Sequence, residues 1–151
     1  MTTISFSNTI EIERPAGEVY TYLADLEHVP DWNWAISETM KMTPGPVTVG
    51  TRFLQSRRVP APATEVLEVI DLDPGRRIEV QGTLADFPVD LVYYFEPTER
   101  GTRVTNTVEL DTHGKAKLLA PILGGRIKRS VAGNLARLKA QLETPERWRA
   151  S

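Results

Sequence analysis

The stretch KAKLLAPILGGRIKRSVAGNLARLKAQLE, from Lys115 to Glu143, decides the fold. Its apolar residues recur three or four positions apart, which is typical of one stripe along a helix. The stripe comprises Leu118, Leu119, Ile122, Leu123, Ile127, Val131, Leu135, Leu138 and Leu142. At about 1.5 Å per residue this helix would be roughly 40 Å long, so we expect it to lie across a broad, curved sheet. Pro121 should either kink the helix or mark the start of its main segment.

Upstream of this helix, the chain begins with a strand that two short helices follow. Residues 4–13 alternate between apolar and polar side chains, which indicates a half-buried strand. Arg14-Pro15-Ala16 then starts a short helix, because proline is favoured in the first helical turn. A second helical piece is expected from Leu26 to Asp31, broken by Pro30.

Six strand-like segments connect the short helices to the long one. They cover Trp32 to Met40, Thr51 to Val59, Ala63 to Leu72, Arg77 to Thr83, Phe87 to Glu96 and Val104 to Leu110. Asp73-Pro74-Gly75-Arg76 predicts a hairpin turn, since proline presets one turn dihedral and glycine accepts a positive φ. Hairpin-linked strands form an antiparallel sheet, and the long helix is the natural cover for its apolar face.

Composition indicates one soluble globular domain. The 151 residues are 40% hydrophobic and 25% charged, so we expect one domain over residues 1–144 and a short tail at 145–151. The absence of cysteine excludes disulfides and thiolate chemistry. A net charge of -2 gives no indication of a nucleic-acid partner. No secretory pattern and no apolar run near the roughly 20 residues of a bilayer span are visible, so we expect a cytoplasmic protein without integral membrane association.

Positive charge is concentrated on the long helix. Lys115, Lys117, Arg126, Lys128, Arg129, Arg137 and Lys139 are accompanied by a single late acid, Glu143. Such a run is typical of a solvated helix face, and it would also suit an acidic ligand or a membrane surface. A protein-interaction module that uses this basic face is a further hypothesis. The sequence leaves the choice between monomer and homodimer open.

Several short segments, together with the order of elements, carry a family resemblance. They are Ile12-Glu13-Arg14-Pro15-Ala16, Val19-Tyr20, the Trp32 region after Asp25-Leu26-Glu27, Val49-Gly50-Thr51-Arg52-Phe53, Leu72-Asp73-Pro74-Gly75-Arg76-Arg77, Tyr94-Phe95-Glu96-Pro97, Gly101-Thr102-Arg103-Val104 and Leu135-Ala136-Arg137-Leu138-Lys139. The chain resembles, over about residues 4–143, the polyketide cyclase/dehydratase and lipid-transport group of the START-like superfamily (SRPBCC, Bet v 1-like). These are packing and turn positions rather than a reactive constellation.

The resemblance implies an α+β helix-grip fold. This fold has a seven-stranded curved antiparallel sheet, two short helices and a long C-terminal helix over a cavity. The resemblance also implies that the cavity binds a hydrophobic or amphipathic small molecule. Members of the group include lipid-transfer proteins, ubiquinone-binding proteins and aromatic polyketide cyclases. The turn at residues 43–48 departs from the glycine-rich loop of the pollen-allergen branch, so nothing attributed to that loop is carried over.

Strand alternation, the helix stripe and a position near the expected entrance supply the candidate ligand-binding residues. They are Trp34, Phe53, Gln55, Arg57, Glu65, Leu67, Val80, Leu91, Tyr93, Phe95, Asn106, Val108, Leu119, Leu123 and Ile127. A one-residue slip in register would turn the strand positions outward. The polar members indicate water or a ligand inside, because a buried unpaired polar group costs roughly 1–3 kcal/mol.

The polar candidates support two different functions. Arg57 and Glu65 either pair across adjacent strands or face a ligand. In an enzyme of the cyclase/dehydratase kind, Arg57 would polarise a polyketone and Tyr93 would move protons. A tyrosine in a strand is more often a packing residue, and no catalytic residue is assigned. The first hypothesis is therefore a binding or carrier protein, and the enzyme is the alternative.

No metal site or cofactor is predicted. His28, Asp31 and Glu27 lie within one helical turn, but the other histidine, His113, is far along the chain. The sequence has no glycine-rich phosphate loop and no serine-nucleophile motif.

The beginning of the long helix also allows two interpretations. Leu118, Leu119, Ile122 and Leu123 are expected to pack in the core, where each buried side chain contributes about 1.5–3 kcal/mol. Alternatively, Pro121 and Gly124-Gly125 favour a segment that moves as a gate for ligand entry.

Overall fold

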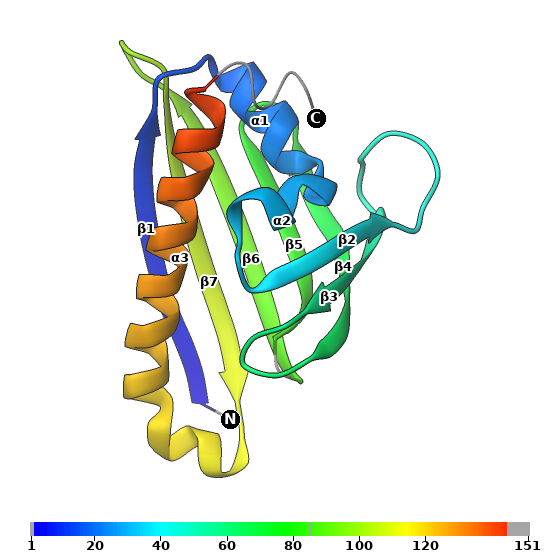
Figure 1. The fold of residues 1–151 in the computed structure, drawn as a ribbon, viewed down its shortest axis with the longest axis vertical. Helices are drawn as coiled ribbons and strands as arrows, with labels where there is room; N and C mark the ends of the chain where they lie inside the picture. Colours follow the sequence, from blue (N-terminus) through cyan, green and yellow to red (C-terminus); the bar gives the residue numbers. More distant parts are fainter. Residues whose placement is uncertain (1, 85, 145–151) are drawn as a thin grey trace.

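One antiparallel sheet and a long helix make up the computed structural model, which describes residues 2–84 and 86–144 (Figure 1). In chain order the elements are β1 (Thr2–Ile12), α1 (Ala16–Ala24), the 3-10 turn η1 (Leu26–His28), α2 (Val29–Trp32), β2 (Ile36–Lys41), β3 (Arg52–Arg57), β4 (Ala63–Asp73), β5 (Arg77–Leu84), β6 (Phe87–Pro97), β7 (Thr102–Thr112), the 3-10 turn η2 (Gly114–Leu119) and α3 (Ala120–Leu142). The expected tail, residues 145–151, lies outside the described residues.

The seven described strands lie in the order β1-β7-β6-β5-β4-β3-β2, and every neighbouring pair is antiparallel. The predicted hairpin between β4 and β5 is confirmed, because the amide of Arg76 donates to the carbonyl of Asp73 at 2.9 Å. Gly75 has a φ of 82° there, which a residue with a side chain rarely adopts. The α+β helix-grip arrangement is thereby confirmed.

The inward faces follow the predicted alternation without a slip. Phe53 and Gln55 of β3 are buried, and so are alternate residues of β7, among them Asn106 and Val108. Direct cross-strand partners on this face include Gln55 with Glu65 and Tyr93 with Asn106. Polar and apolar side chains therefore share the face that the helices cover.

The long helix proper starts at Ala120, with Pro121 in its first turn. Pro121 thus marks the start of the main segment, which was one of the two predicted alternatives. Figure 1 shows α3 running along β1, and its C-terminal half also packs against α2. A methyl group at Gly124 would lie 3.1 Å from Cγ2 of Ile4, so helix and strand approach closely at this glycine.

The predicted core packing of Leu118, Leu119 and Ile122 is wrong. These side chains are 83%, 52% and 62% exposed. The regular helix begins only after Leu119, and its first turns present Ala120 and Leu123 to the sheet. The neighbouring apolar residues consequently point away from the sheet.

Two expectations near the short helices are also corrected. The second strand begins at Ile36 rather than at Trp32, because Trp32 ends α2 and is buried there. Pro30 does not break the second helical piece but occupies the first turn of α2, where its missing amide donor is not needed. Trp34 lies in the loop before β2 and is 47% exposed.

The apolar interior divides into two clusters. At the end covered by α1 and α2, which we call the capped end, a large cluster joins both short helices to the sheet and to Leu135, Leu138 and Leu142 of α3. At the other end, residues 114–126 form a segment that we call the tip. Only Ile4, Val89, Val108, Leu110 and Ala120 form the smaller buried cluster beside it, counted over the described residues. Within the same residues, no helix has the length and apolarity to cross a membrane.

Candidate functional site

The interior between the sheet and α3 contains thirteen of the fifteen candidate residues. Buried members are Phe53, Gln55, Glu65, Leu67, Val80, Tyr93, Phe95, Asn106 and Val108, and half-buried members are Arg57, Leu91, Leu123 and Ile127. The other two, Trp34 and Leu119, are exposed and do not line this interior. Alternation of apolar and polar residues predicts the inward positions of the strands. Trp34 and Leu119 lie outside the strands, where this alternation gives no information.

A buried ion pair occupies the β3–β4 side of the interior. Arg57 Nε lies 3.0 Å from both carboxylate oxygens of Glu65, and Gln55 Nε2 donates to Glu65 Oε1 at 3.0 Å. The Glu65 side chain is 2% exposed and that of Arg57 is 11% exposed. The alternative in which these residues pair with each other is therefore observed, and the pair is diagonal, since Arg57 lies directly opposite Ala63. The guanidinium is already engaged with a carboxylate.

A second polar group lies on β6 and β7. Tyr93 and Asn106 are direct cross-strand partners, and both are buried. Burial raises the pKa of the Tyr93 phenol well above its usual range, so the hydroxyl stays protonated. Asn106 Nδ2 donates a long hydrogen bond of 3.4 Å to the carbonyl of Val92, while Asn106 Oδ1 has no hydrogen-bond partner among the described residues.

Further buried polar atoms lack partners within residues 2–84 and 86–144. Among them are Asn134 Oδ1 on α3, Trp32 Nε1 on α2 and Thr39 Oγ1 on β2. Thr39 is the cross-strand neighbour of Gln55, and Asn134 is 5% exposed next to Leu135. Each unpaired buried atom costs about 1–3 kcal/mol unless water or a ligand satisfies it. The polar groups of the interior are therefore suited to a bound molecule.

Apolar residues enclose the polar group of β7 on both sides along the strand. Val104 belongs to the cluster of the capped end and Val108 to the cluster near the tip, so Asn106 lies between the two. Leu91 is half-buried and packs against both clusters. Along β7, a polar side chain therefore lies between two apolar ones. This arrangement suits a molecule with an apolar body and a polar group near its middle.

Sequence reasoning missed a surface hollow of about 410 Å³ between the first short helices and the segment before β3. Its lining includes Tyr20, Tyr22, His28, Lys41 and Val47, and none of the fifteen candidates. The rings of Tyr22 and His28 stack with their centroids 4.1 Å apart. Burial, and then the charge of Asp31, raise the pKa of Tyr22 to about 12. The closeness in sequence of two tyrosines and a histidine was the only available signal.

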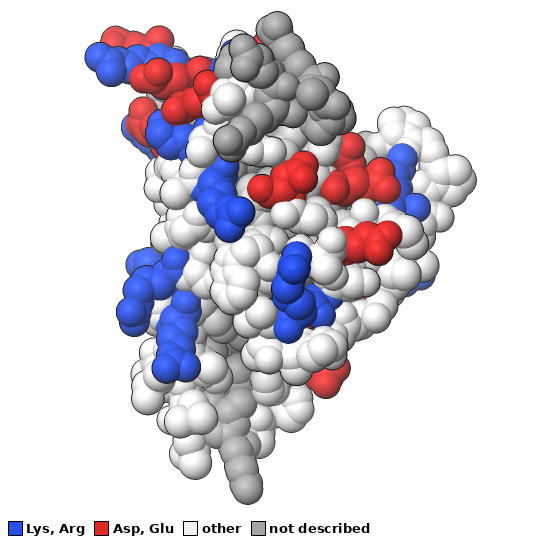
Figure 2. Space-filling model, viewed as in Figure 1, with Lys and Arg blue, Asp and Glu red and all other residues white. Residues whose placement is uncertain are grey.

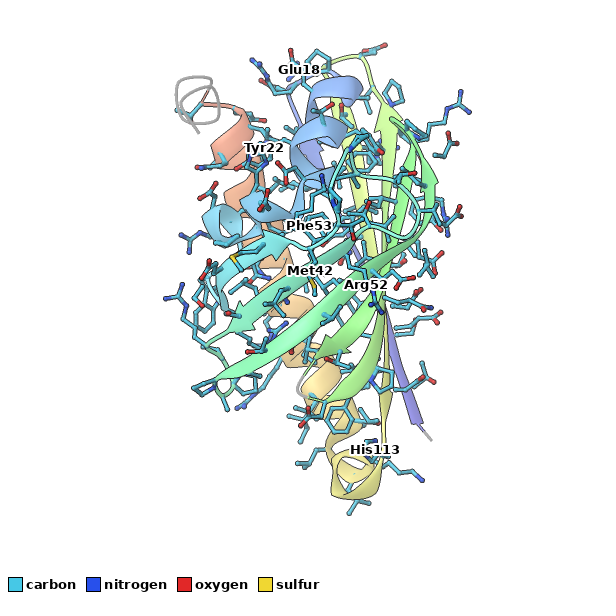
Figure 3. All side chains as sticks on the ribbon, turned by 90° about the vertical axis from the view of Figure 1, so that its right-hand side faces the viewer. Glu18, Tyr22, Met42, Arg52, Phe53 and His113 are labelled. Atoms are coloured by element: carbon cyan, nitrogen blue, oxygen red, sulfur yellow. The ribbon has the colours of Figure 1, made fainter. Side chains whose placement is uncertain are left out.

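A second hollow of about 420 Å³ lies on the outer face of the sheet. It is lined by acidic residues that include Glu79, Asp90, Glu109 and Asp111. Burial, and then a hydrogen bond with Glu79, raise the pKa of Asp90 to about 6. The described part of the chain contains no group of three or more histidine or acidic side chains arranged to bind a metal ion. Figure 3 shows Tyr22 and His113 at opposite ends of the molecule, so the two histidine regions are separate.

Solved structures of three proteins illustrate the same architecture. The Zhui aromatase/cyclase from Streptomyces sp. R1128 is 16% identical, with 94% of each chain covered and a TM-score of 0.77. Ara h 8.0201 is 14% identical over 92% of this chain and 97% of that one, with a TM-score of 0.71. The di-domain ARO/CYC StfQ from the steffimycin biosynthetic pathway is 18% identical, with a TM-score of 0.73; 91% of this chain covers 50% of that protein. At these identities the likeness establishes the fold alone.

Comparison with family models identifies the group. The model described as "Polyketide cyclase / dehydrase and lipid transport" matches residues 3–143, which is nearly the whole chain. A search of curated proteins gives no match. The chain therefore belongs to the polyketide cyclase / dehydrase and lipid transport family.

Proposed function

We propose that this protein binds a hydrophobic or amphipathic small molecule between α3 and the sheet, and that it carries the molecule rather than transforms it. The observation that carries the proposal is the carboxamide of Asn106. It is 1% exposed, and Asn106 Oδ1 has no partner among the described residues. A ligand hydroxyl or amine that donates to this oxygen would recover the about 1–3 kcal/mol that its burial costs.

The surrounding residues define the ligand class. Val104 and Val108 on either side of Asn106 are both almost fully buried, which favours apolar groups on both sides of a polar one. Asn134 Oδ1 would accept a second hydrogen bond, and Trp32 Nε1 would donate one. A ligand with a ring or acyl body and one or two hydroxyl or carbonyl groups satisfies these requirements.

An enzyme of the cyclase/dehydratase kind is the second candidate, and Tyr93 favours it. Its buried phenol stays protonated and could donate a hydrogen bond or a proton to a carbonyl. Against this role, the guanidinium of Arg57 is held by Glu65 and also donates to the carbonyl of Val59 at 3.4 Å. A Tyr93→Phe variant that keeps its ligand affinity but loses turnover would select the enzyme over the carrier.

The test combines ligand identification with thermal unfolding. Native mass spectrometry of the protein purified from its own host should show a stoichiometric small molecule that denaturation releases. A panel of fatty acids, quinones and polycyclic aromatics should then stabilise the delipidated protein, by about 2.7 kcal/mol at a ligand concentration of 100 Kd.

Matched variants separate binding in the interior from adsorption elsewhere. Asn106→Leu should raise the Kd of the ligand by at least about fivefold, because it leaves the donor group of the ligand buried without an acceptor, which costs about 1–3 kcal/mol. Thr107→Val, one position along β7 and on its outer face, should bind like the unchanged protein. Equal ligand-induced shifts in both variants, or no shift with any ligand class, would overturn the proposal.

A further inference from the structure

The tip presents three large apolar side chains to solvent in one short segment. Leu118 and Leu119 in η2 are 83% and 52% exposed, and Ile122 in the first turn of α3 is 62% exposed. Ala120 and Leu123 of the same segment already cover the sheet, and neither buried cluster of the described residues includes the other three. Figure 1 shows that this segment forms the lower tip of the molecule.

Four cationic side chains lie near this apolar group. Lys117, Arg126, Lys128 and Arg129 are exposed, and none of them forms a salt bridge with a described residue. No acidic residue occurs in the sequence between Asp111 and Glu143. The tip and the helix behind it therefore present positive charge, although the chain as a whole has a net charge of -2.

The uneven charge distribution would orient the molecule relative to an anionic surface. Figure 2 shows Lys and Arg side chains along α3 above uncharged surface, and Asp and Glu side chains gathered over the short helices. An anionic surface would attract the tip and repel the capped end. A helix end with apolar residues directed outward and basic residues beside them is the combination that inserts into the headgroup region of a membrane.

We propose that the tip, through Leu118, Leu119 and Ile122, docks on anionic lipid membranes. The three apolar side chains enter the boundary between headgroups and acyl chains, and Lys117 and Arg126 contact the lipid phosphates. Lipid explains the tip better than a second copy does, because a dimer built on this patch would bring the cations of both copies together. The inference goes beyond ligand binding in the interior and does not require it.

Vesicle sedimentation tests the proposal with the full chain. The probes are sucrose-loaded vesicles of phosphatidylcholine alone and of phosphatidylcholine mixed equally with phosphatidylglycerol. The protein should bind the anionic vesicles at least about tenfold more tightly, and raised salt should reduce this difference because it screens the charges. The triple variant Leu118→Ser, Leu119→Ser, Ile122→Ser should lose binding by at least about tenfold.

A matched control uses exposed apolar residues far from the tip. Met40, Met42 and Val49 are 47%, 52% and 56% exposed, and their replacement by serine should leave vesicle binding unchanged. Circular dichroism of both triple variants should show the native fold, since the altered positions are on the surface. Lys117→Gln with Arg126→Gln should weaken binding to anionic vesicles only.

Three results would overturn the proposal. They are equal binding to neutral and anionic vesicles, full vesicle binding by the tip variant, and absence of binding to either vesicle. A concentration-dependent dimer that the tip variant abolishes, seen by analytical ultracentrifugation without lipid, would assign the patch to self-association instead. None of these results bears on ligand binding in the interior, so the proposed function is tested independently by mass spectrometry and thermal unfolding.

Discussion

The two ends of the helical segment formed by η2 and α3 carry the same kind of side chain in opposite surroundings. Leu135, Leu138 and Leu142 at the capped end are at most 1% exposed, whereas Leu118 at the tip is 83% exposed. The difference arises from what lies opposite the helix, since α2 and the sheet enclose its C-terminal half. The same periodic apolar pattern therefore stabilises the core at one end and exposes apolar side chains to solvent at the other.

This contrast also locates the candidate site. The capped end is closed by a large apolar cluster, and the tip end by a small one. Between them lies the amide oxygen of Asn106, for which the described part of the chain offers no hydrogen-bond partner. A ligand placed at this level would have a rigid wall on one side and a weakly held helix start on the other. Local opening is favoured where few apolar contacts hold a segment.

The largest expected effect contrasts two leucines of the same helix region. Leu138→Ala should lower the free energy of unfolding by about 2–5 kcal/mol, because it empties a fully enclosed position. Leu118→Ala should change it by no more than about 0.5 kcal/mol, because the side chain already contacts water. Urea unfolding monitored by circular dichroism measures both values. Similar losses in the two variants would show that the tip is covered in solution.

Much of the sheet could be predicted because its pattern is local. Phe53 with Gln55, and Tyr93 with Asn106, point inward as the alternation of their strands requires. The hairpin at Gly75 requires a positive φ, which glycine adopts more readily than any other residue. These features depend on neighbours in sequence, so no knowledge of distant contacts was needed.

The features that the sequence missed or left open depend on how whole segments are placed in the fold. Asn134 resembles a solvated polar residue in the helix, and only the rotation of α3 against the sheet buries it. Leu118 fits the apolar stripe, but the register of the turn before Ala120 directs it outward. Whether Arg57 pairs with Glu65 depends on the register of two strands that a proline-rich turn connects.

A glycine in the first turns of α3 gives a sharper test of the tip. An added methyl group at Gly125 would meet no atom within 4 Å, so Gly125→Ala should stabilise the protein by about 0.5–1 kcal/mol through helix propensity. Gly133→Ala, equally free of contacts in the same helix, is the matched control. If the tip opens locally as a gate, only Gly125→Ala should slow hydrogen exchange at residues 120–127. Equal slowing by both variants would remove the gate hypothesis.

The smallest expected effect concerns the polar clamp that closes the capped end. Glu143 Oε2 accepts hydrogen bonds from Lys139 Nζ at 2.7 Å and from the amide of Glu13 at 2.9 Å. Burial alone would raise the pKa of Glu143, but these hydrogen bonds outweigh it and lower the pKa below its ordinary value. A lowered pKa in the folded state stabilises the fold above the unfolded-state pKa, and this stabilisation is lost as pH falls through the folded value.

Glu143→Gln should therefore lower the free energy of unfolding by about 0.2–1 kcal/mol at neutral pH, because the clamp is partly exposed and water screens it. The difference should shrink as the pH falls below about 4, where the carboxyl becomes protonated first in the unfolded chain, and it should vanish once the pH passes the lower pKa of the folded state. Urea unfolding across this pH range measures it, with Glu38→Gln on the exposed edge of β2 as the control. A difference that persisted at low pH would mean that the side chain of Glu143 acts by packing rather than by charge. Glu143 would then stabilise the capped end in the same way as its buried leucines do, and the contrast with the tip would owe nothing to this charge.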